Sequence, residues 1–147
     1  MNYAELLRQK ERYEEAKAAL DEALTISVHF NGKRHEATAE IINNLGQICR
    51  LLGDLANGEA MLLEALQIRR ELFGDLDVSV AATLNNLGEL YREQDEYLKA
   101  INFHNLSIEA FDKAVGPTHP GTVNAKGNLG ITLRRYAAVN MQQGETL

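Results

Sequence analysis

The sequence predicts an all-α fold, an array of antiparallel helical hairpins with about three and a half copies of one unit. Asn-Asn-Leu-Gly at 43–46 returns 42 residues later at 85–88, and returns again as Gly-Asn-Leu-Gly at 127–130. Gly32, Gly74 and Gly116 keep the same spacing without a gap. Such a fixed period is the signature of a repeat architecture, in which each unit buries its apolar face against its neighbours.

Each unit has the pattern of two amphipathic helices. In the third unit, Leu84, Leu87, Gly88 and Tyr91 fall at i, i+3, i+4 and i+7, which is one face of a helix. A second helical stretch of the same kind begins at Tyr97. Two short helices in succession, repeated along the chain, predict stacked hairpins.

Tight turns are expected inside the units at 10–12, 52–54 and 94–96. The glycines at 32, 74 and 116 follow the second helices, where a glycine can adopt the left-handed conformation of a C-terminal cap. Pro117 and Pro120 then prevent the helix from continuing.

The predicted organisation is one array over residues 1–147, with units at about 1–36, 37–78, 79–120 and 121–147. The first and last units are incomplete in this phase. No helix breaker occurs at 136–141, so the last helix is expected to continue to about Gln143. Its uncovered side indicates either that the chain is a piece of a longer array or that it self-associates end to end through Tyr136, Val139 and Met141.

Small residues recur at one position of the first helices, namely Ala4, Gly46, Gly88 and Gly130. A glycine inside a helix costs about 1 kcal/mol relative to alanine. Three glycines at the same position therefore predict close contact with the neighbouring helix.

With these motifs, the chain resembles the tetratricopeptide repeat family in the 42-residue form typical of kinesin light chains. The resemblance rests on Asn-Asn-Leu-Gly-Glu-Leu-Tyr at 85–91, on Tyr97 and Ala100, and on Gly-Pro-Thr-His-Pro at 116–120. It covers about residues 1–136. It implies a right-handed superhelical solenoid whose first helices line a concave groove that binds extended peptides.

A polar stripe lies opposite the expected core face on the first helices, by the geometry of a helical wheel. We expect this stripe to line the groove, because amides can bond an extended backbone and arginine can bind a carboxylate. Its members are Asn43, Gln47, Arg50, Asn85, Glu89, Arg92, Asn124 and Arg134. The alternative is a solvated helix surface with pairs such as Glu89–Arg92. Gly127 and Ile131 interrupt the stripe.

Other repeated positions are assigned to packing. Asn2, Asn44, Asn86 and Asn128 lie between the core and groove faces, so they are expected to bridge neighbouring helices. Cys49 stands where other units carry Leu7, Tyr91 and Leu133, which predicts a core residue. His104 stands where Leu20 and Leu62 occur, which predicts a semi-buried packing residue.

Composition and motifs argue against several functional classes. The net charge is -6 with no basic run, so nucleic acid and anionic membranes are not expected partners. A single cysteine and four scattered histidines supply no metal site, no nucleophile motif appears, and no cofactor is expected. The sequence therefore predicts a cytoplasmic, non-enzymatic module that binds a protein or peptide, with a preference for acidic ligands. The alternatives are a structural or self-assembling segment and a regulatory segment of a larger signalling protein.

Overall fold

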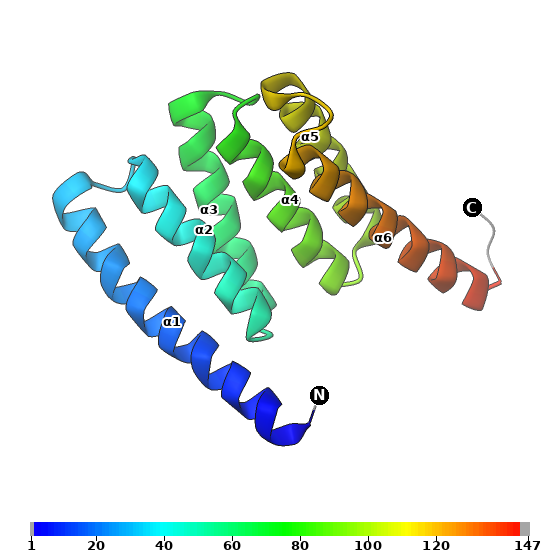
Figure 1. The fold of residues 1–147 in the computed structure, drawn as a ribbon, viewed down its shortest axis with the longest axis horizontal. Coiled ribbons are helices and arrows are strands. Elements are labelled where there is room, and N and C mark those ends of the chain that lie inside the picture. Colours follow the sequence, from blue (N-terminus) through cyan, green and yellow to red (C-terminus); the bar gives the residue numbers. More distant parts are fainter. Residues whose placement is uncertain (1, 145–147) are drawn as a thin grey trace. The chain divides into compact units, whose positions relative to one another are not determined.

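The computed structural model describes residues 2–144, and this range contains six helices and no strand. The helices are α1 (Tyr3–Asn31), α2 (Glu36–Leu51), α3 (Leu55–Phe73), α4 (Val78–Glu93), α5 (Tyr97–Val115) and α6 (Pro120–Gln142) (Figure 1). The predicted all-α class is confirmed. No helix in this range is both long and apolar enough to cross a membrane.

The chain divides into two compact units, residues 1–72 and 73–147. In the first unit α1 packs along α2. In the second unit α5 contacts both α4 and α6, and α4 also contacts α6. The helices α2, α4 and α6 occupy the first-helix position of the repeat, and α3 and α5 occupy the second.

The first helices all begin with a side-chain cap at the same repeat position. The capping residues are His35, Asp77 and His119, each of which accepts a hydrogen bond from the amide two residues further on. The distances are 3.0, 2.8 and 3.0 Å. A side-chain acceptor at this point satisfies one of the amides that the first turn of a helix leaves unpaired. The shared position of His35 and His119 in the sequence therefore reflects a structural role.

The predicted left-handed glycines are confirmed after α1, α3 and α5. Gly32, Gly74 and Gly116 have φ values of 82°, 83° and 86°. The carbonyls of Gly32 and Gly116 accept hydrogen bonds from the hydroxyls of Thr38 and Thr122 at 2.8 and 2.7 Å. These bonds tie the connecting loop to the helix that follows.

The turn predicted at 10–12 is wrong, because α1 continues through these residues as one helix of 29 residues. The corresponding turns of the next two units use left-handed residues, Gly53 with φ 83° and Asp95 with φ 61°. Glu11 occupies this position in α1 and adopts a helical conformation, which its neighbours Lys10 and Arg12 also favour. The predicted continuation of the last helix is confirmed, since α6 passes through Ala137 and ends at Gln142.

Close helix contact at the repeated glycines is confirmed in two of the hairpins. A Cβ atom on Gly46 would lie 2.7 Å from Leu62 Cγ, and one on Gly88 would lie 2.5 Å from His104 Cε1. At Gly130 the nearest such atom is Arg134 Nη1 of the same helix, at 3.5 Å. The first two glycines thus allow α2 and α4 to approach α3 and α5, whereas α6 has no helix against Gly130.

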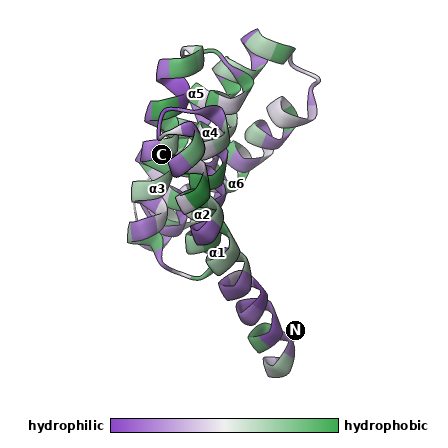
Figure 2. Cartoon of the chain, turned by 90° about the vertical axis from the view of Figure 1, so that its left-hand side faces the viewer, coloured by the Kyte–Doolittle hydropathy of each residue, from purple (hydrophilic) through white to green (hydrophobic). Residues whose placement is uncertain are grey.

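The apolar core lies between the helices of each unit. In the first unit it includes Ala39, Ile42, Ala65 and Ile68, and in the second Ala81, Ala110, Phe111 and Ala125. Figure 2 shows several hydrophilic turns in the N-terminal half of α1.

Candidate protein-binding surface

The residues of the predicted stripe differ widely in exposure. Asn43, Asn85 and Arg92 are 8%, 4% and 9% exposed. Gln47, Arg50 and Glu89 are half-buried, and Asn124 and Arg134 on α6 are exposed. The helical wheel therefore places part of the stripe correctly, but the expectation that Asn43, Asn85 and Arg92 lie away from the packed faces is wrong.

In the second unit the stripe residues of α4 take part in a buried polar network with α5 and α6. Asn85 Oδ1 lies 3.2 Å from His104 Nδ1 and 3.4 Å from Asn128 Nδ2. Asn128 Nδ2 also donates to Glu89 Oε1 at 2.9 Å. The amide of Asn128 thus connects α6 to two residues of α4, which confirms its predicted role as a bridge between helices.

The network continues through His104, which has no exposed surface. Its Nε2 lies 3.1 Å from Thr132 Oγ1 on α6. Arg92 Nη1 donates to the same hydroxyl at 3.4 Å and to the carbonyl of Asn128 at 3.2 Å. All these bonds are satisfied together when His104 is neutral with its proton on Nδ1, donating to Asn85 and accepting from Thr132.

The surroundings of His104 disfavour its charged form. Burial, and secondarily the positive charge of Arg92, lower the pKa of His104 from 6.5 to about 4. A proton on Nε2 would also remove the acceptor that Thr132 uses. His104 is therefore a neutral packing and hydrogen-bonding residue near pH 7, more deeply buried than the sequence predicted.

On α2 the stripe residues interact within their own helix. Asn43 Nδ2 donates to Asn44 Oδ1 at 3.4 Å, and Arg50 Nε donates to Gln47 Oε1 at 3.4 Å. Gln47 and Arg50 nevertheless keep part of their surface accessible. They are the members of this half of the stripe that a ligand can reach without unfolding the helix.

Two further predictions about packing residues have definite outcomes. Cys49 is 1% exposed, as predicted, and burial is the main reason that the pKa of its thiol is raised. It is therefore a buried neutral thiol that is poorly suited to act as a nucleophile. Asn2, expected to bridge helices, instead caps α1 by accepting from the amide of Glu5 at 2.8 Å.

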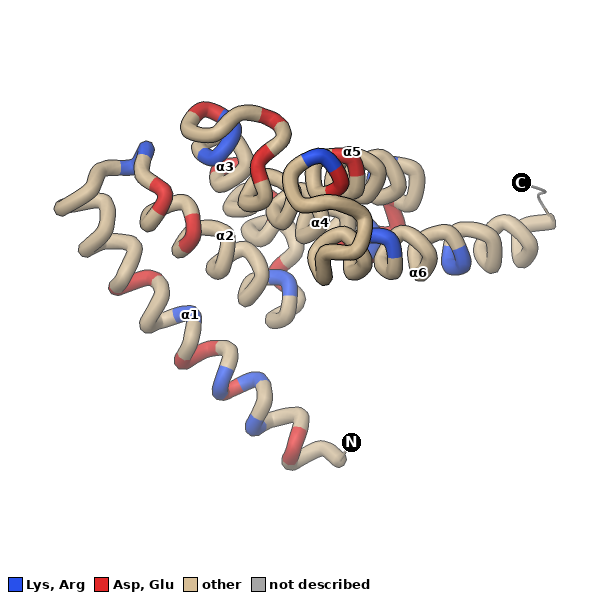
Figure 3. Tube along the Cα trace, turned by 45° about the horizontal axis from the view of Figure 1, so that its top comes forward, with Lys and Arg blue, Asp and Glu red and all other residues tan. Residues whose placement is uncertain are grey.

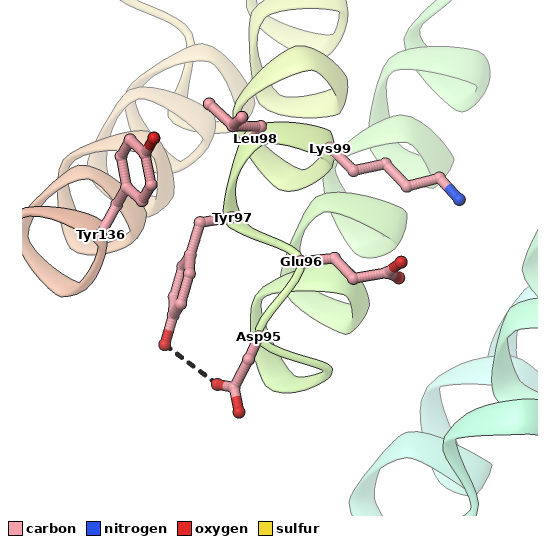
Figure 4. Close-up of a pocket in the computed structure, with 6 residues that line it drawn as sticks. All are labelled: Asp95, Glu96, Tyr97, Leu98, Lys99 and Tyr136. Carbon is pink, nitrogen blue, oxygen red and sulfur yellow. Dashed lines mark hydrogen bonds between the residues drawn. The ribbon is translucent and has the colours of Figure 1, made fainter. Parts of the chain in front are cut away.

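A shallow pocket lies between the start of α5 and the face of α6. Its walls include Tyr97, Leu98 and Tyr136, with Asp95, Glu96 and Lys99 around them (Figure 4). The rings of Tyr97 and Tyr136 are 6.0 Å apart, and the Tyr97 hydroxyl donates to Asp95 at 2.9 Å. This hydrogen bond raises the pKa of Tyr97. Leu98 is 67% exposed, so the pocket offers apolar surface next to carboxylates.

No group of three or more His, Cys, Asp or Glu side chains within residues 2–144 is arranged to hold a metal ion. His104, whose pKa is lowered, has no exposed surface. Surfaces that are open to a partner include the polar positions of α2 and α6 and the Tyr97–Tyr136 pocket.

The sequence matches the tetratricopeptide repeat family over three overlapping ranges, residues 1–71, 39–113 and 79–138. The chain belongs to the tetratricopeptide repeat family. The family is generally one of protein–protein interaction modules. This family and fold are typically non-enzymatic scaffolds.

Solved structures share this architecture. BtubC (BKLC) from P. vanneervenii is 28% identical, has a TM-score of 0.78, and aligns over 90% of this chain and 52% of its own. A Podosopora anserina protein with nearly identical kinesin-light-chain TPR-like repeats has a TM-score of 0.75 at 14% identity, over 95% of this chain and 72% of its own. These similarities establish the TPR-like solenoid fold.

A curated relative supports the same family. A TPR repeat-containing protein of Dictyostelium discoideum is 31% identical over 91 residues, which cover 60% of this chain and 6% of that protein. The chain thus spans a small part of this relative and about half of the BtubC structure.

The hydrogen-bonded network around His104 was not predicted from the sequence. One signal pointed to it: His104 occupies a position that is leucine in the preceding units, and a polar side chain there needs partners on the facing helices. The partners Asn85 and Thr132 are polar residues on those helices, but their proximity depends on how α6 packs against α4 and α5.

Proposed function

We propose that the chain binds an extended peptide segment of a partner protein along the polar stripe of its first helices. The observation that carries this proposal is the recurrence of arginine at one repeat position (Arg50, Arg92 and Arg134) and of asparagine at another (Asn43 and Asn85). The accessible groups are Gln47 and Arg50 on α2, Glu89 on α4, and Asn124 and Arg134 on α6. Family membership supports it, because the family generally binds proteins.

The buried members of the stripe have a supporting role in this proposal. Asn85 and Arg92 hold α6 against α4 and α5 and so fix the position from which Asn124 and Arg134 face solvent. Direct ligand contact is assigned to the exposed and half-buried groups. The location we propose is the cytoplasm.

The ligands we favour carry acidic residues. The accessible stripe includes Arg50 and Arg134, and α6 has Lys126, Arg134 and Arg135 but no Asp or Glu (Figure 3). A carboxylate can form charge-assisted hydrogen bonds with an exposed guanidinium. Such contacts weaken as salt screens the charges.

The test is a set of fluorescent peptides of about 12 residues, with and without acidic residues, measured by anisotropy. The double variant Asn124→Ala and Arg134→Ala should weaken binding of acidic peptides about tenfold or more, because it removes two exposed contacts. The matched control is Lys113→Ala, which removes an exposed charge from α5. Equal affinity in the double variant and wild type, or affinity independent of salt, would contradict the proposal.

A further inference from the structure

Within residues 2–144, the helices α1 and α6 have no helix in the hairpin position that the repeat provides elsewhere. Residues 13–31 of α1 align with α3 and α5, which occupy the second-helix position. Because α1 runs straight through Glu11, residues 3–12 do not fold back onto it as a first helix. In the same way α6 occupies the first-helix position and runs straight through Ala137 instead of turning into a second helix.

Residues at the same repeat position are more exposed on α1 and α6 than on the helices of the complete hairpins. Leu62 and His104 have no exposed surface, whereas Leu20, at the same position in α1, is only half-buried. On the other side of the hairpin, Cys49 and Tyr91 are each 1% exposed, whereas Leu133 of α6 is 45% exposed.

These two faces match in shape. Gly46 faces Leu62 and Gly88 faces His104, so a first-helix glycine receives the side chain at this second-helix position. Gly130 of α6 has the glycine but no facing residue, and Leu20 of α1 has the side chain but no facing glycine. The two helices are therefore the two halves of one hairpin contact.

The match extends along both helices. Placing Leu20 against Gly130 in antiparallel orientation sets two stripes with heptad-like spacing opposite each other. The stripe of α1 comprises Leu6, Gln9, Tyr13, Ala16, Leu20 and Ala23, and that of α6 comprises Val123, Lys126, Gly130, Leu133, Ala137 and Met141. Leu6, Val123 and Met141 are 50%, 56% and 77% exposed. In this alignment residues 8–30 of α1 lie opposite α6, so the straight continuations of both helices, beyond Glu11 and Ala137, contribute to the contact.

The charges of the two helices are also complementary. The helix α6 has three Lys or Arg residues and no carboxylate, whereas α1 has six Asp or Glu residues and four Lys or Arg (Figure 3). In the antiparallel alignment, Arg12 of α1 would lie near the start of α5. Asp95 and Glu96 line the pocket beside Tyr136 there. Attraction between such patches favours this pairing over pairing of α6 with another α6.

We infer that copies of this chain associate head to tail, with α1 of one copy packed antiparallel on α6 of the next as the missing half of its hairpin. The occupant of the α6 face is a second copy. Such an interface is heterologous, because each copy contributes a different surface at each end. The inference goes beyond peptide binding by the polar stripe and does not depend on it. The inferred contact includes Met141, as the sequence predicted. It uses Gly130 and Leu133 in place of Tyr136, because Tyr136 already packs on Tyr97.

The test is sedimentation velocity of the 147-residue chain at concentrations up to about 1 mM. The wild type should show an average mass that exceeds the monomer mass and increases with concentration. Gly130→Gln should remain monomeric, since its side chain would occupy the space for Leu20. The substitution leaves the fold intact because the nearest atom that a Cβ on Gly130 would meet is the end of the exposed Arg134 side chain, at 3.5 Å, and circular dichroism checks this.

A matched control adds the same side chain to α6 outside the pairing stripe. Ala138→Gln changes an exposed residue about 80° around the helix from Gly130, so it should self-associate like the wild type. A wild-type chain that stays monomeric at every concentration overturns the inference. So does a Gly130→Gln variant that associates as strongly as the wild type.

A second arm combines two variants, one on each side of the contact. Leu20→Ala should associate at least about fivefold more weakly than the wild type, because it removes the side chain that fills the space over Gly130. Mixing it with Gly130→Gln should restore association, since Leu20 of the Gly130→Gln copy then meets the unchanged Gly130 of the Leu20→Ala copy. Failure of the mixture to associate more strongly than either variant alone contradicts the assigned pairing. Peptide affinity measured on Leu20→Ala, which leaves α2, α4 and α6 unchanged, reports on the polar stripe separately.

Discussion

The hairpins α2–α3 and α4–α5 have the same glycine at the same repeat position but place different side chains against it. Gly46 faces the aliphatic side chain of Leu62, whereas Gly88 faces the ring of His104. The nearest atoms at Gly46 are two carbons of Leu62, followed by the Gly58 carbonyl oxygen at 3.2 Å, whereas the His104 ring has both nitrogens hydrogen-bonded, to Asn85 and Thr132. The glycine therefore fixes how closely the helices approach, and the facing residue decides whether the hairpin is also linked to the next helix.

This difference has a consequence for rigidity. Leu62 is free to adjust its rotamer when a neighbour changes, because it has no directional bonds. His104 is held at two nitrogens by residues of α4 and α6, so any shift of the ring breaks a buried hydrogen bond. The second unit should thus tolerate changes at the helix contact less well than the first.

The largest expected effect is that of Gly88→Ala. The added Cβ would lie 2.5 Å from the His104 ring, which cannot move without losing partners. We expect the free energy of unfolding in urea to decrease by about 2–3 kcal/mol. Gly46→Ala should cost about 1 kcal/mol, since Leu62 can move, and Gly130→Ala should stabilise the chain slightly. Equal losses for Gly88→Ala and Gly46→Ala would contradict the proposed difference in rigidity.

The next effect is that of His104→Leu, which gives the second hairpin the side chain of the first. Although leucine is apolar, the change leaves the Asn85 oxygen and the Thr132 hydroxyl with one buried partner fewer. We expect a loss of about 2 kcal/mol in unfolding free energy. Adding Thr132→Val should recover part of this loss, because one stranded polar group is then removed. A His104→Leu chain as stable as the wild type would show that the network contributes little.

A smaller effect is expected from pH, and it isolates His104. Its pKa is about 4 in the folded chain and about 6.5 when unfolded, so between these values the unfolded chain binds more protons. The contribution of neutral His104 to the free energy of unfolding is fully present above pH 6.5 and decreases as the pH falls toward 4. Between pH 7 and 5 the decrease should be on the order of 1–2 kcal/mol. The measurement is urea unfolding at several pH values, with His104→Leu as the control in which this part of the pH dependence disappears.

The smallest effect concerns the turns inside the two hairpins. Gly53 and Asp95 both have positive φ, but only glycine does so without steric cost. Gly53→Ala should reduce the unfolding free energy by about 1 kcal/mol. Asp95→Gly should change it by less than about 0.5 kcal/mol, because relief of backbone strain is offset by loss of the Tyr97 hydrogen bond. Thermal unfolding monitored at 222 nm distinguishes these outcomes, and a larger loss for Asp95→Gly than for Gly53→Ala would contradict them.

Most of the fold could be predicted from the sequence, because it follows from local and periodic information. The 42-residue spacing located the helices, the left-handed glycines at 32, 74 and 116, and the close approach at Gly46 and Gly88. The continuation of α6 through Ala137 followed from the absence of a breaker. The straight course of α1 through Glu11 was missed, because repeat alignment imposed a turn where the local residues favour helix.

The sequence alone determined the repeat, the helical hairpins and the family, since these depend on spacing and helix propensity along the chain. Only the tertiary structure decided which polar residues of the stripe are buried and which face solvent. A helical wheel describes one helix, whereas the burial of Asn85 and Arg92 depends on α6 covering α4. Gly130 has no neighbouring helix against it and Leu20 is only half-buried, because α6 and α1 continue straight where the repeat would turn into a second helix.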